Sequence, residues 1–326
     1  MVGAGAFGRN HARVYRQLRE KGEAVELAAI VDTNPAHAAA VRREFGNPPC
    51  LSLDELPGRV EAASVAVPTV EHLKVARTLM ESGIDVLIEK PLATSLAEAE
   101  EIIRIAERTG RVAQVGHLER FNPAVRATVP LLTRPMFFEV HRLSVFTPRS
   151  LDIDVILDLM IHDLDIVLSF IGSPVKEIRA VGLPILTSKV DIANVRMEFE
   201  SGCVANFTAS RVSTERVRKL RFFQPQQYIS IDYSRQDVMV FTVDPHAAAA
   251  KASPNPGIGM RKPPVAPAEP LHAELRSFLD AVRHRKRPEV PLEDGRRALA
   301  VALDVLTAIH EHSHRVGLDA AGRQKS

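Results

Sequence analysis

The first 117 residues alternate short apolar runs with helical segments, and this alternation constrains the fold more than any other feature of the chain. The apolar runs are nearly continuous in Val, Ile and Ala, which is typical of strands covered on both faces of a parallel sheet. The segments between them space their apolar residues at helical intervals and end at glycine. The pattern predicts an α/β domain with a doubly wound parallel sheet. Its predicted strands are residues 24–32, 62–68, 84–91 and 111–117, and its predicted helices are residues 9–22, 35–46, 70–83 and 95–110.

After about residue 135 the sequence predicts a different kind of domain. Consecutive segments show the period of two that is typical of strands, and strands grouped in succession favour an antiparallel sheet. Residues 244–270 hold 7 of the 22 prolines, which predicts a mobile loop or an extended excursion. We therefore expect two domains, residues 1–119 and residues 120–326, the second of α+β class. Its predicted strands are residues 137–146, 177–185, 193–202 and 203–212, and residues 220–233 and 237–244 continue the pattern. Its predicted helices are residues 155–171, 271–285 and 294–312.

Composition and charge disfavour several classes of function. The chain of 326 residues has 42 Lys+Arg and 40 Asp+Glu, so its formal net charge is +2, and no concentrated basic face indicates a nucleic-acid partner. No apolar run reaches the roughly 20 residues that cross a bilayer, and no signal peptide is visible. Cys50 and Cys203 fit neither a metal-ligand spacing nor a disulfide framework. We expect a cytoplasmic protein with no membrane, nucleic-acid or metal partner.

A glycine-rich turn, Gly3-Ala4-Gly5-Ala6-Phe7-Gly8, opens the first predicted helix. In such a GxGxxG turn, the first glycine permits the tight turn, the second admits a pyrophosphate, and the third lets helix and strand pack closely. The helix N-terminus then offers free N–H groups to the anion. Only Met1 and Val2 precede the turn, so we expect the first strand of the domain to be truncated.

Asp32 ends the next predicted strand, 24 residues after Gly8. An acid at this place hydrogen-bonds the ribose hydroxyls of a bound dinucleotide. Thr33 and Asn34 follow it, and no adjacent Arg could hold a 2′-phosphate, so the sequence favours NAD over NADP. The alternative is a glycine turn with a helix-capping acid and no nucleotide, which the strand–helix–strand context disfavours.

Two further motifs carry side chains suited to catalysis. Glu89-Lys90-Pro91 ends a predicted strand, where functional residues of open α/β sheets lie, and a Lys there could polarise a substrate oxygen. Asp158 and His162 are four residues apart, so an α-helix would place them on one face, where the carboxylate could orient the imidazole as a base. Taken alone, such a lysine is more often solvated, and such an Asp–His pair is more often a surface ion pair. His162 and Asp165 lack a third ligand for a metal site.

Residues 116–123, Gly-His-Leu-Glu-Arg-Phe-Asn-Pro, follow the last predicted strand of the first domain. Polar residues at a domain junction are well placed to bind a ligand. The alternative interpretation is an interdomain hinge that is held by ion pairs.

In combination, these motifs resemble the Gfo/Idh/MocA family of oxidoreductases. The resemblance covers nearly the whole chain: GAGAFG at 3–8, VPT at 67–69 with His72, EKP at 89–91, GHLERFNP at 116–123, DLMIHDLD at 158–165 and EPLHAELRSFLDAV at 269–282. Members of this family pair an N-terminal Rossmann domain with a C-terminal domain built on an open, mostly antiparallel sheet. Within the family, GHLERFNPA and DLMIHDLD are most similar to the UDP-N-acetylglucosamine 3-dehydrogenase-like branch.

The resemblance implies roles for individual residues. Lys90, Asp158 and His162 match the catalytic set of the family, and Glu89 matches a residue near the nicotinamide. The other implied cofactor contacts are Gly3, Gly5, Ala6, Phe7, Gly8, Asp32, Thr33, Pro68, Thr69, His72 and Lys90. The candidate substrate contacts are Lys90, Glu119, Arg120, Asn122, Arg149 and His162.

We therefore expect an NAD-dependent dehydrogenase of a sugar or cyclitol alcohol, with the C3 hydroxyl of a UDP-N-acetylhexosamine as the favoured substrate. His162 would remove the hydroxyl proton, Lys90 would stabilise the charge that develops on the oxygen, and Asp158 would orient His162. Two alternatives stay open. One is another oxidoreductase of the family, acting on inositol, another polyol, a glucose–fructose pair or a non-sugar substrate. The other is a non-catalytic dinucleotide-binding sensor.

The second domain also bears on assembly. An antiparallel sheet with one uncovered face would expose a large apolar patch, and such patches mark interfaces. We therefore expect a homodimer or homotetramer that forms through the C-terminal sheet.

Overall fold

The structure is a computed structural model of the chain, and it describes residues 1–147, 153–243 and 257–317. The chain divides into two compact units. The first contains Met1–Phe121 and Ala268–Leu299, and the second contains Asn122–Pro267 and Ala300–Ser326. Residues 268–299 follow the predicted boundary between residues 119 and 120, yet they pack in the first unit.

The first unit contains a parallel sheet of order β1-β2-β3 with helices packed around it. Leu18 of α1, Phe278 of α8 and Leu87 of β2 are fully buried in one apolar cluster, which explains why residues 268–299 join this unit. The strands are β1 (Ala62–Val65), β2 (Asp85–Glu89) and β3 (Ala113–Gly116). The helices are α1 (Ala6–Glu20), α2 (Pro35–Glu44), η1 (Leu53–Glu55), η2 (Thr69–Glu71), α3 (His72–Glu81), α4 (Leu96–Thr109), η3 (Leu118–Phe121) and α8 (Pro270–His284). The last helix, α9 (Leu292–Arg315), begins in this unit and ends in the second.

Helix ends follow local chemistry. Asn34 caps α2 by accepting a hydrogen bond from the N–H of Ala36 at 2.9 Å, and Pro35 occupies the first turn, where no N–H donor is needed. Gly110 ends α4 in the left-handed region, with φ of 61°, which glycine adopts without strain. These signals lie within a few residues of each helix end, so they can be recognised in the sequence.

The predicted strand at 24–32 is wrong in extent. Only Ile30 and Val31 form isolated bridges, to Cys50 and to Val2 respectively, and residues 25–29 belong to no strand among the described residues. The other three predicted strands of this unit are confirmed by β1, β2 and β3. The reason for the difference is that a ladder needs paired neighbours along its whole length, and among the described residues only Val2 and Cys50 form bridges to this segment.

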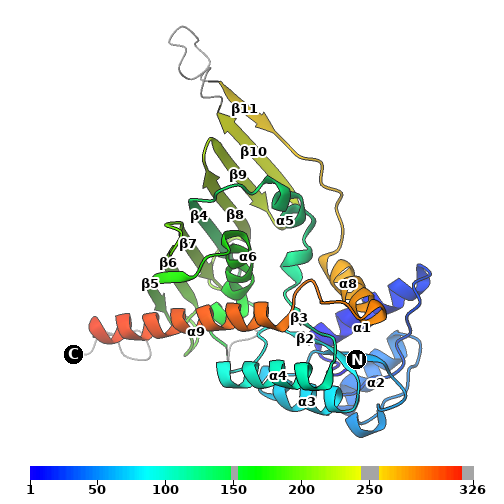
Figure 1. Ribbon diagram of the computed structural model, residues 1–326. Coiled ribbons are helices and arrows are strands. Elements are labelled where there is room, and N and C mark those ends of the chain that lie inside the picture. The colour runs from blue at the N-terminus through cyan, green and yellow to red at the C-terminus, as the bar shows by residue number, and fades with distance from the viewer. Residues whose placement is uncertain (148–152, 244–256, 318–326) are drawn as a thin grey trace. The chain divides into compact units, whose positions relative to one another are not determined.

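The second unit is built on one eight-stranded sheet of order β11-β10-β9-β8-β4-β7-β6-β5 (Figure 1). β4 runs parallel to β7, and every other neighbouring pair is antiparallel. The predicted α+β class with a mostly antiparallel sheet is therefore confirmed. The strands are β4 (Phe137–Leu143), β5 (Val175–Leu183), β6 (Ile192–Phe199), β7 (Val204–Ser210), β8 (Val217–Gln224), β9 (Gln227–Asp232), β10 (Asp237–Val243) and β11 (Ile258–Arg261). The helices are α5 (Pro123–Thr128), η4 (Val129–Leu131), η5 (Ile156–Met160) and α6 (Ile161–Ile171).

One face of this sheet packs against α6, which Figure 1 shows lying along the middle strands. Phe170 of α6 meets Phe222 of β8 edge-on, with 6.1 Å between ring centroids, and Phe222 stacks on Phe138 of β4. Residues of β4 alternate between buried and half-buried, as expected for a strand whose successive side chains point to opposite faces. The covered face is therefore the core of the unit.

The interpretation of residues 244–270 as a loop or excursion needs correction. The described part contains β11, which pairs with β10 and places Met260 beside Phe241. All four residues of β11 are exposed, so this edge strand has no apolar pattern that the sequence could reveal. Residues 244–256 lie outside the described residues.

Two sequence predictions can be compared with these elements. No helix in the part of the chain that the structure describes is long and apolar enough to cross a membrane. Cys50 is exposed, Cys203 is buried, and both are free thiols. Burial raises the pKa of Cys203 to about 11, so this thiol is unreactive at neutral pH.

Candidate functional site

The glycine-rich turn has the shape that a dinucleotide pyrophosphate requires. A Cβ atom at Gly3 would lie 2.5 Å from the carbonyl oxygen of Ala66, and one at Gly8 would lie 1.7 Å from the carbonyl oxygen of Gly3. Side chains are therefore excluded at both positions by the packing of the turn. A Cβ atom at Gly5 would meet nothing within 4 Å, so the turn is open at its second glycine, where the phosphates approach.

The N-terminus of α1 provides an electrostatic environment that favours an anion. Gly5 is the N-cap of α1 and supplies no capping side chain, and the first turn contains no acidic residue. Ala6 and Phe7 are exposed there. The free N–H groups and the positive end of the helix dipole are thus available to an anion, and the residues fit the pyrophosphate of NAD or NADP.

Asp32, in the segment next to the glycine-rich turn, stabilises that turn by hydrogen bonds. Its carboxylate accepts hydrogen bonds from the N–H of Ala4 at 2.5 Å and from the N–H of Asn34 at 2.7 Å. The side chain of Asp32 is 11% exposed, and Thr33 beside it is exposed. Asp32 therefore holds the turn in place and also keeps a negative charge next to it.

His72 connects the ends of two strands. Its Nε2 lies 3.1 Å from the carbonyl oxygen of Val67, and its Nδ1 lies 3.1 Å from the carbonyl oxygen of Pro91. Burial lowers the pKa of His72, although the carbonyl contacts oppose this shift. The ring thus links the segment after β1, which includes half-buried Thr69 and exposed Pro68, to the segment after Lys90.

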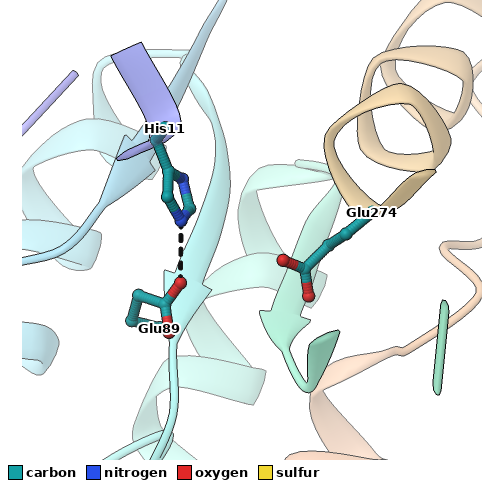
Figure 2. Close-up of side chains that lie close together, drawn as sticks. All are labelled: His11, Glu89 and Glu274. Atoms are coloured by element: carbon teal, nitrogen blue, oxygen red, sulfur yellow. Dashed lines mark hydrogen bonds and ion pairs between the residues drawn. The ribbon is translucent and has the colours of Figure 1, made fainter. Parts of the chain in front are cut away.

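Three buried side chains from different elements lie close together at the end of β2 (Figure 2). Nε2 of His11, on α1, lies 2.8 Å from Oε1 of Glu89, and Glu274 of α8 points its carboxyl group toward this pair. One ligand atom from each residue lies within 4.8 Å of the others. Neither carboxyl oxygen of Glu274 has a hydrogen-bond partner among the described residues. No spacing in the sequence could reveal this cluster, because its members come from three distant segments.

The charges of this cluster follow from its burial. Burial alone would raise the pKa of Glu89, but the hydrogen bond and charge of His11 and the charge of Lys90 hold that pKa below its ordinary value. Burial and then the charge of Glu89 raise the pKa of Glu274 well above its ordinary value. The same cluster therefore shifts its two carboxyl groups in opposite directions: Glu89 toward the ionised form and Glu274 toward the protonated form.

Glu274→Gln should make the protein increasingly more stable than the wild type as the pH rises above 4.5, the ordinary pKa of a glutamate, and leave its stability unchanged below that pH. Because the pKa of Glu274 is higher in the folded chain, the unfolded chain ionises first as the pH rises. The wild type should then lose up to about 1.4 kcal/mol of unfolding free energy per pH unit relative to the glutamine variant. Urea unfolding at several pH values measures this slope. Glu107→Gln, at an exposed position of α4, is the control, and parallel curves for wild type and Glu274→Gln would contradict the assignment.

Lys90 follows Glu89 directly and is half-buried. Its N–H donates a hydrogen bond to Oε2 of Glu89 at 3.3 Å. Gly116 of β3 lies opposite Glu89, and a Cβ atom there would come within 3.0 Å of the Glu89 carboxyl carbon. The glycine therefore gives Glu89 room to turn inward to His11, which fixes the backbone from which Lys90 extends.

Asp158 and His162 lie in the second unit, on two successive turns. Asp158 belongs to a π-helical segment, η5, and His162 belongs to α6, which follows without a break. Asp158 is half-buried and His162 is 9% exposed. A π-helical turn inside a helix is frequently found at a functional site. The spacing of four predicts an α-helix, and the structure differs at Asp158 because the turn there is π-helical and therefore wider.

A buried ion pair fixes the helix that carries His162. Arg142 of β4 donates two hydrogen bonds to the carboxylate of Asp163, at 2.6 and 2.9 Å. The guanidinium carbon of Arg142 also lies 5.3 Å from the ring centroid of Tyr233. Asp163 follows His162 directly, so this pair ties α6 to the sheet next to the candidate base. Sequence reasoning missed Arg142 because its partner is on another element.

Two of the remaining candidate substrate-binding residues, Arg120 and Asn122, form hydrogen bonds within their own units. Arg120 donates a hydrogen bond to Asp294 at 2.6 Å, and Glu119 is buried. Asn122 caps α5 by accepting from the N–H of Ala124 at 3.1 Å, and it donates to the carbonyl oxygen of Tyr233 at 3.1 Å. Each of these contacts lies within one unit, so they do not test the interpretation of residues 116–123 as an interdomain hinge. Arg149 lies outside the described residues.

Comparison with known proteins extends these observations across the chain. Residues 1–117 match the model of an oxidoreductase family with an NAD-binding Rossmann fold, GFO_IDH_MocA, and residues 135–229 match the GFO/IDH/MocA C-terminal domain. A UDP-N-acetylglucosamine 3-dehydrogenase from Acidithiobacillus ferrooxidans is 35% identical over 97% of this chain and 98% of its own length. A structure of that enzyme has a TM-score of 0.87 and 35% identity, and the alignment covers 95% of this chain and 96% of the other. A scyllo-inositol 2-dehydrogenase (NAD(+)) from Bacillus subtilis is 27% identical over 65% of this chain and 67% of its own length.

The two family models match residues of both sheets. The NAD-binding description of the first model agrees with the open turn at Gly5 and with the start of α1, which has no capping side chain. The fold, the nucleotide-binding turn and the identity over nearly the full length all point to one conclusion. The chain belongs to the GFO/IDH/MocA family of NAD-binding oxidoreductases.

Proposed function

We propose that this protein is an NAD-dependent dehydrogenase that acts on C3 of a UDP-N-acetylhexosamine. The observation that carries the proposal is the 35% identity to a UDP-N-acetylglucosamine 3-dehydrogenase over 97% of the chain. Lys90, Asp158 and His162 supply the lysine, acid and base that such a reaction needs. A sensor that only binds nucleotide would not need this set.

The residues have distinct roles in this proposal. NAD, when bound, supplies the nicotinamide that accepts hydride from the sugar carbon or returns it. His162 holds the proton that leaves the hydroxyl group, and the buried position of its ring keeps that proton away from bulk water. Lys90 hydrogen-bonds the same oxygen and stabilises its negative charge. Asp158, one turn before His162, orients the imidazole and favours its protonated form.

Asp32 supports NAD as the cofactor in preference to NADP. Its carboxylate stands beside the turn that receives the phosphates and is held there by two backbone N–H groups. A carboxylate in this place accepts hydrogen bonds from the ribose hydroxyls and repels a 2′-phosphate. The two free cysteines support a reducing compartment, and we propose a cytoplasmic location.

The second sheet supports assembly into a homodimer or homotetramer. On the face opposite α6, the aromatic rings of Phe137, Phe223, Tyr228 and Phe241 form a ladder across four strands, with 4.8 to 5.6 Å between neighbouring ring centroids. Phe223 is 37% exposed. A second copy of the chain would cover this aromatic ladder, and the mass of the protein in solution tests this.

Initial rates with two substrates test the proposed activity. Purified protein with NAD and UDP-N-acetylglucosamine should produce the absorbance of reduced nicotinamide, and the rate with NADP should be lower. scyllo-Inositol is the matched comparison, because an inositol dehydrogenase is among the relatives. Faster turnover of scyllo-inositol would replace the proposed substrate. NAD binding without turnover of either compound would favour the sensor.

A further inference from the structure

The cluster of His11, Glu89 and Glu274 holds a carboxyl group without partners deep in the first unit. His11 and Glu274 are fully buried, and Glu89 is only 7% exposed. The carboxyl group of Glu274 points toward the other two side chains (Figure 2), yet neither of its oxygens has a hydrogen-bond partner among the described residues. Leaving a buried polar group unpaired is costly, and such a group in a folded protein often marks the place of a bound ion or water.

A proton on Glu274 removes the charge of this group but does not complete its bonding. The O–H of a protonated carboxyl group is a donor, and it needs an acceptor within hydrogen-bond distance. Among the described residues, no acceptor for Glu274 is present. A cation is a partner that the two carboxylates and the imidazole can share. The bonding of the cluster therefore favours a cation over a proton alone.

The three side chains meet closely enough for one ion. Nε2 of His11 lies 2.8 Å from Oε1 of Glu89, and one ligand atom from each of the three residues lies within 4.8 Å of the others. Two ligands of one zinc ion, each bonded at about 2.0–2.2 Å, lie about 3.0–3.4 Å apart. His11 and Glu89 are close to this separation, and a small rotation of the Glu274 side chain would bring its carboxylate to the same point.

Gln114 of β3 offers a fourth oxygen beside the cluster. It precedes Gly116 by two residues, so both face the same side of the sheet, where Gly116 lies against the carboxyl group of Glu89. Nε2 of Gln114 donates to the backbone carbonyl oxygen of Glu274 at 3.4 Å, which places this side chain next to α8. Gln114 is fully buried, and its Oε1 also lacks a partner among the described residues.

We propose that His11, Glu89 and Glu274 bind one divalent transition-metal ion, and that the ion is Zn²⁺. One imidazole and two carboxylates are ordinary ligands of zinc, whereas Mg²⁺ and Ca²⁺ prefer oxygen ligands alone. Two carboxylates and one dication have no net charge, so burying the three together costs much less than burying two ionised carboxylates. The ion replaces the hydrogen bond between His11 and Glu89 with two bonds to the metal.

The proposed ion has a structural role. It joins α1, β2 and α8, three elements that are far apart in the sequence, and the burial of its ligands leaves no open position for a substrate. Glu89 directly precedes Lys90, whose N–H donates to Oε2 of Glu89, so the ion would also hold the backbone from which Lys90 extends. The pH dependence of stability expected for Glu274→Gln describes the protein without metal, and it is measured with a chelator present.

Zinc binding by three proteins tests the proposal. Each is freed of metal with a chelator, dialysed against Zn²⁺ and analysed for zinc bound per chain. The wild type should hold one zinc ion, and a free zinc concentration about 100 times Kd should raise its Tm by about 5 °C. Glu274→Gln keeps the shape of the side chain but loses a charged ligand, so it should bind zinc at least about 100-fold more weakly. The control is the double variant His310→Gln/His314→Gln, which removes two exposed histidines one turn apart on α9 and should bind zinc as the wild type does.

The outcomes separate this cluster from other zinc ligands of the chain. Equal zinc binding by the wild type and Glu274→Gln would overturn the proposal, and so would loss of the bound zinc in the double variant. A wild type that retains no zinc would show that a proton or water completes the cluster. X-ray absorption at the zinc edge should show nitrogen and oxygen ligands at about 2.0–2.2 Å, and a sulfur ligand would assign the ion to a cysteine instead. All of these measurements use protein without substrate, so they do not depend on the proposed activity.

Discussion

Replacing Lys90 with alanine should lower kcat by about 10²- to 10³-fold and change the affinity for NAD little. The reason is that a cation aimed at a developing oxyanion contributes to the transition state much more than to the ground state. Binding of NAD depends on the open turn at Gly5 and on the start of α1, and the Lys90 side chain belongs to neither. Steady-state rates and NAD titrations of the same preparation measure the two quantities separately.

The His162→Ala variant should lower kcat by about 10²- to 10⁴-fold, the range for loss of a general base. Lys74→Ala, at an exposed position of α3, is the matched control and should behave as wild type. Wild-type turnover by Lys90→Ala or His162→Ala would remove that residue from the mechanism. Equal losses in both kcat and NAD affinity would show a structural role.

The parts of the site that depend on local chain chemistry could be predicted from the sequence. The glycine turn at 3–8 is one example, since two of its glycines are required by contacts with atoms a few residues or one strand away. Glu89 and Lys90 are another, because the end of a parallel strand can be located by its apolar run and by the proline that follows. Patterns of this kind are set by the backbone, and the backbone geometry of a strand or a turn repeats from protein to protein.

The contacts that support the site could not be predicted in the same way. Glu89 and His11 are 78 residues apart, and the third member of their cluster, Glu274, comes from a helix that the sequence assigned to the other domain. Each looks ordinary in its own segment, and only the packing of α1 and α8 on β2 brings them together. For segment 24–32, the sequence predicted more structure than is present. Its composition suits a strand, but a strand is defined by hydrogen bonds to neighbouring strands, and in this segment only Ile30 and Val31 form bridges.

Breaking the buried pair of Arg142 and Asp163 should have the largest effect on stability. Both side chains are almost fully buried, and they are joined by two short hydrogen bonds between charged groups. Removing one partner takes away the opposite charge and the two short hydrogen bonds that stabilise the other in the core. Arg142→Met should therefore lower the unfolding free energy by about 3–5 kcal/mol. Urea unfolding followed by far-UV circular dichroism measures the loss.

The double variant Arg142→Met/Asp163→Leu separates the cost of a lone charge from the value of the pair. Replacing both partners by apolar residues of similar volume removes the unpaired charge, so the double variant should recover most of the stability that Arg142→Met loses. Arg179→Met on β5 is the control, because Arg179 pairs with Glu177 on the exposed surface, where such pairs contribute little. If the double variant were no more stable than Arg142→Met, the charge of Asp163 would not be the cause of the loss. If the double variant is as stable as the wild type but its kcat stays lowered, the pair also positions His162. In that case apolar packing holds α6 to the sheet but does not fix the orientation of the helix.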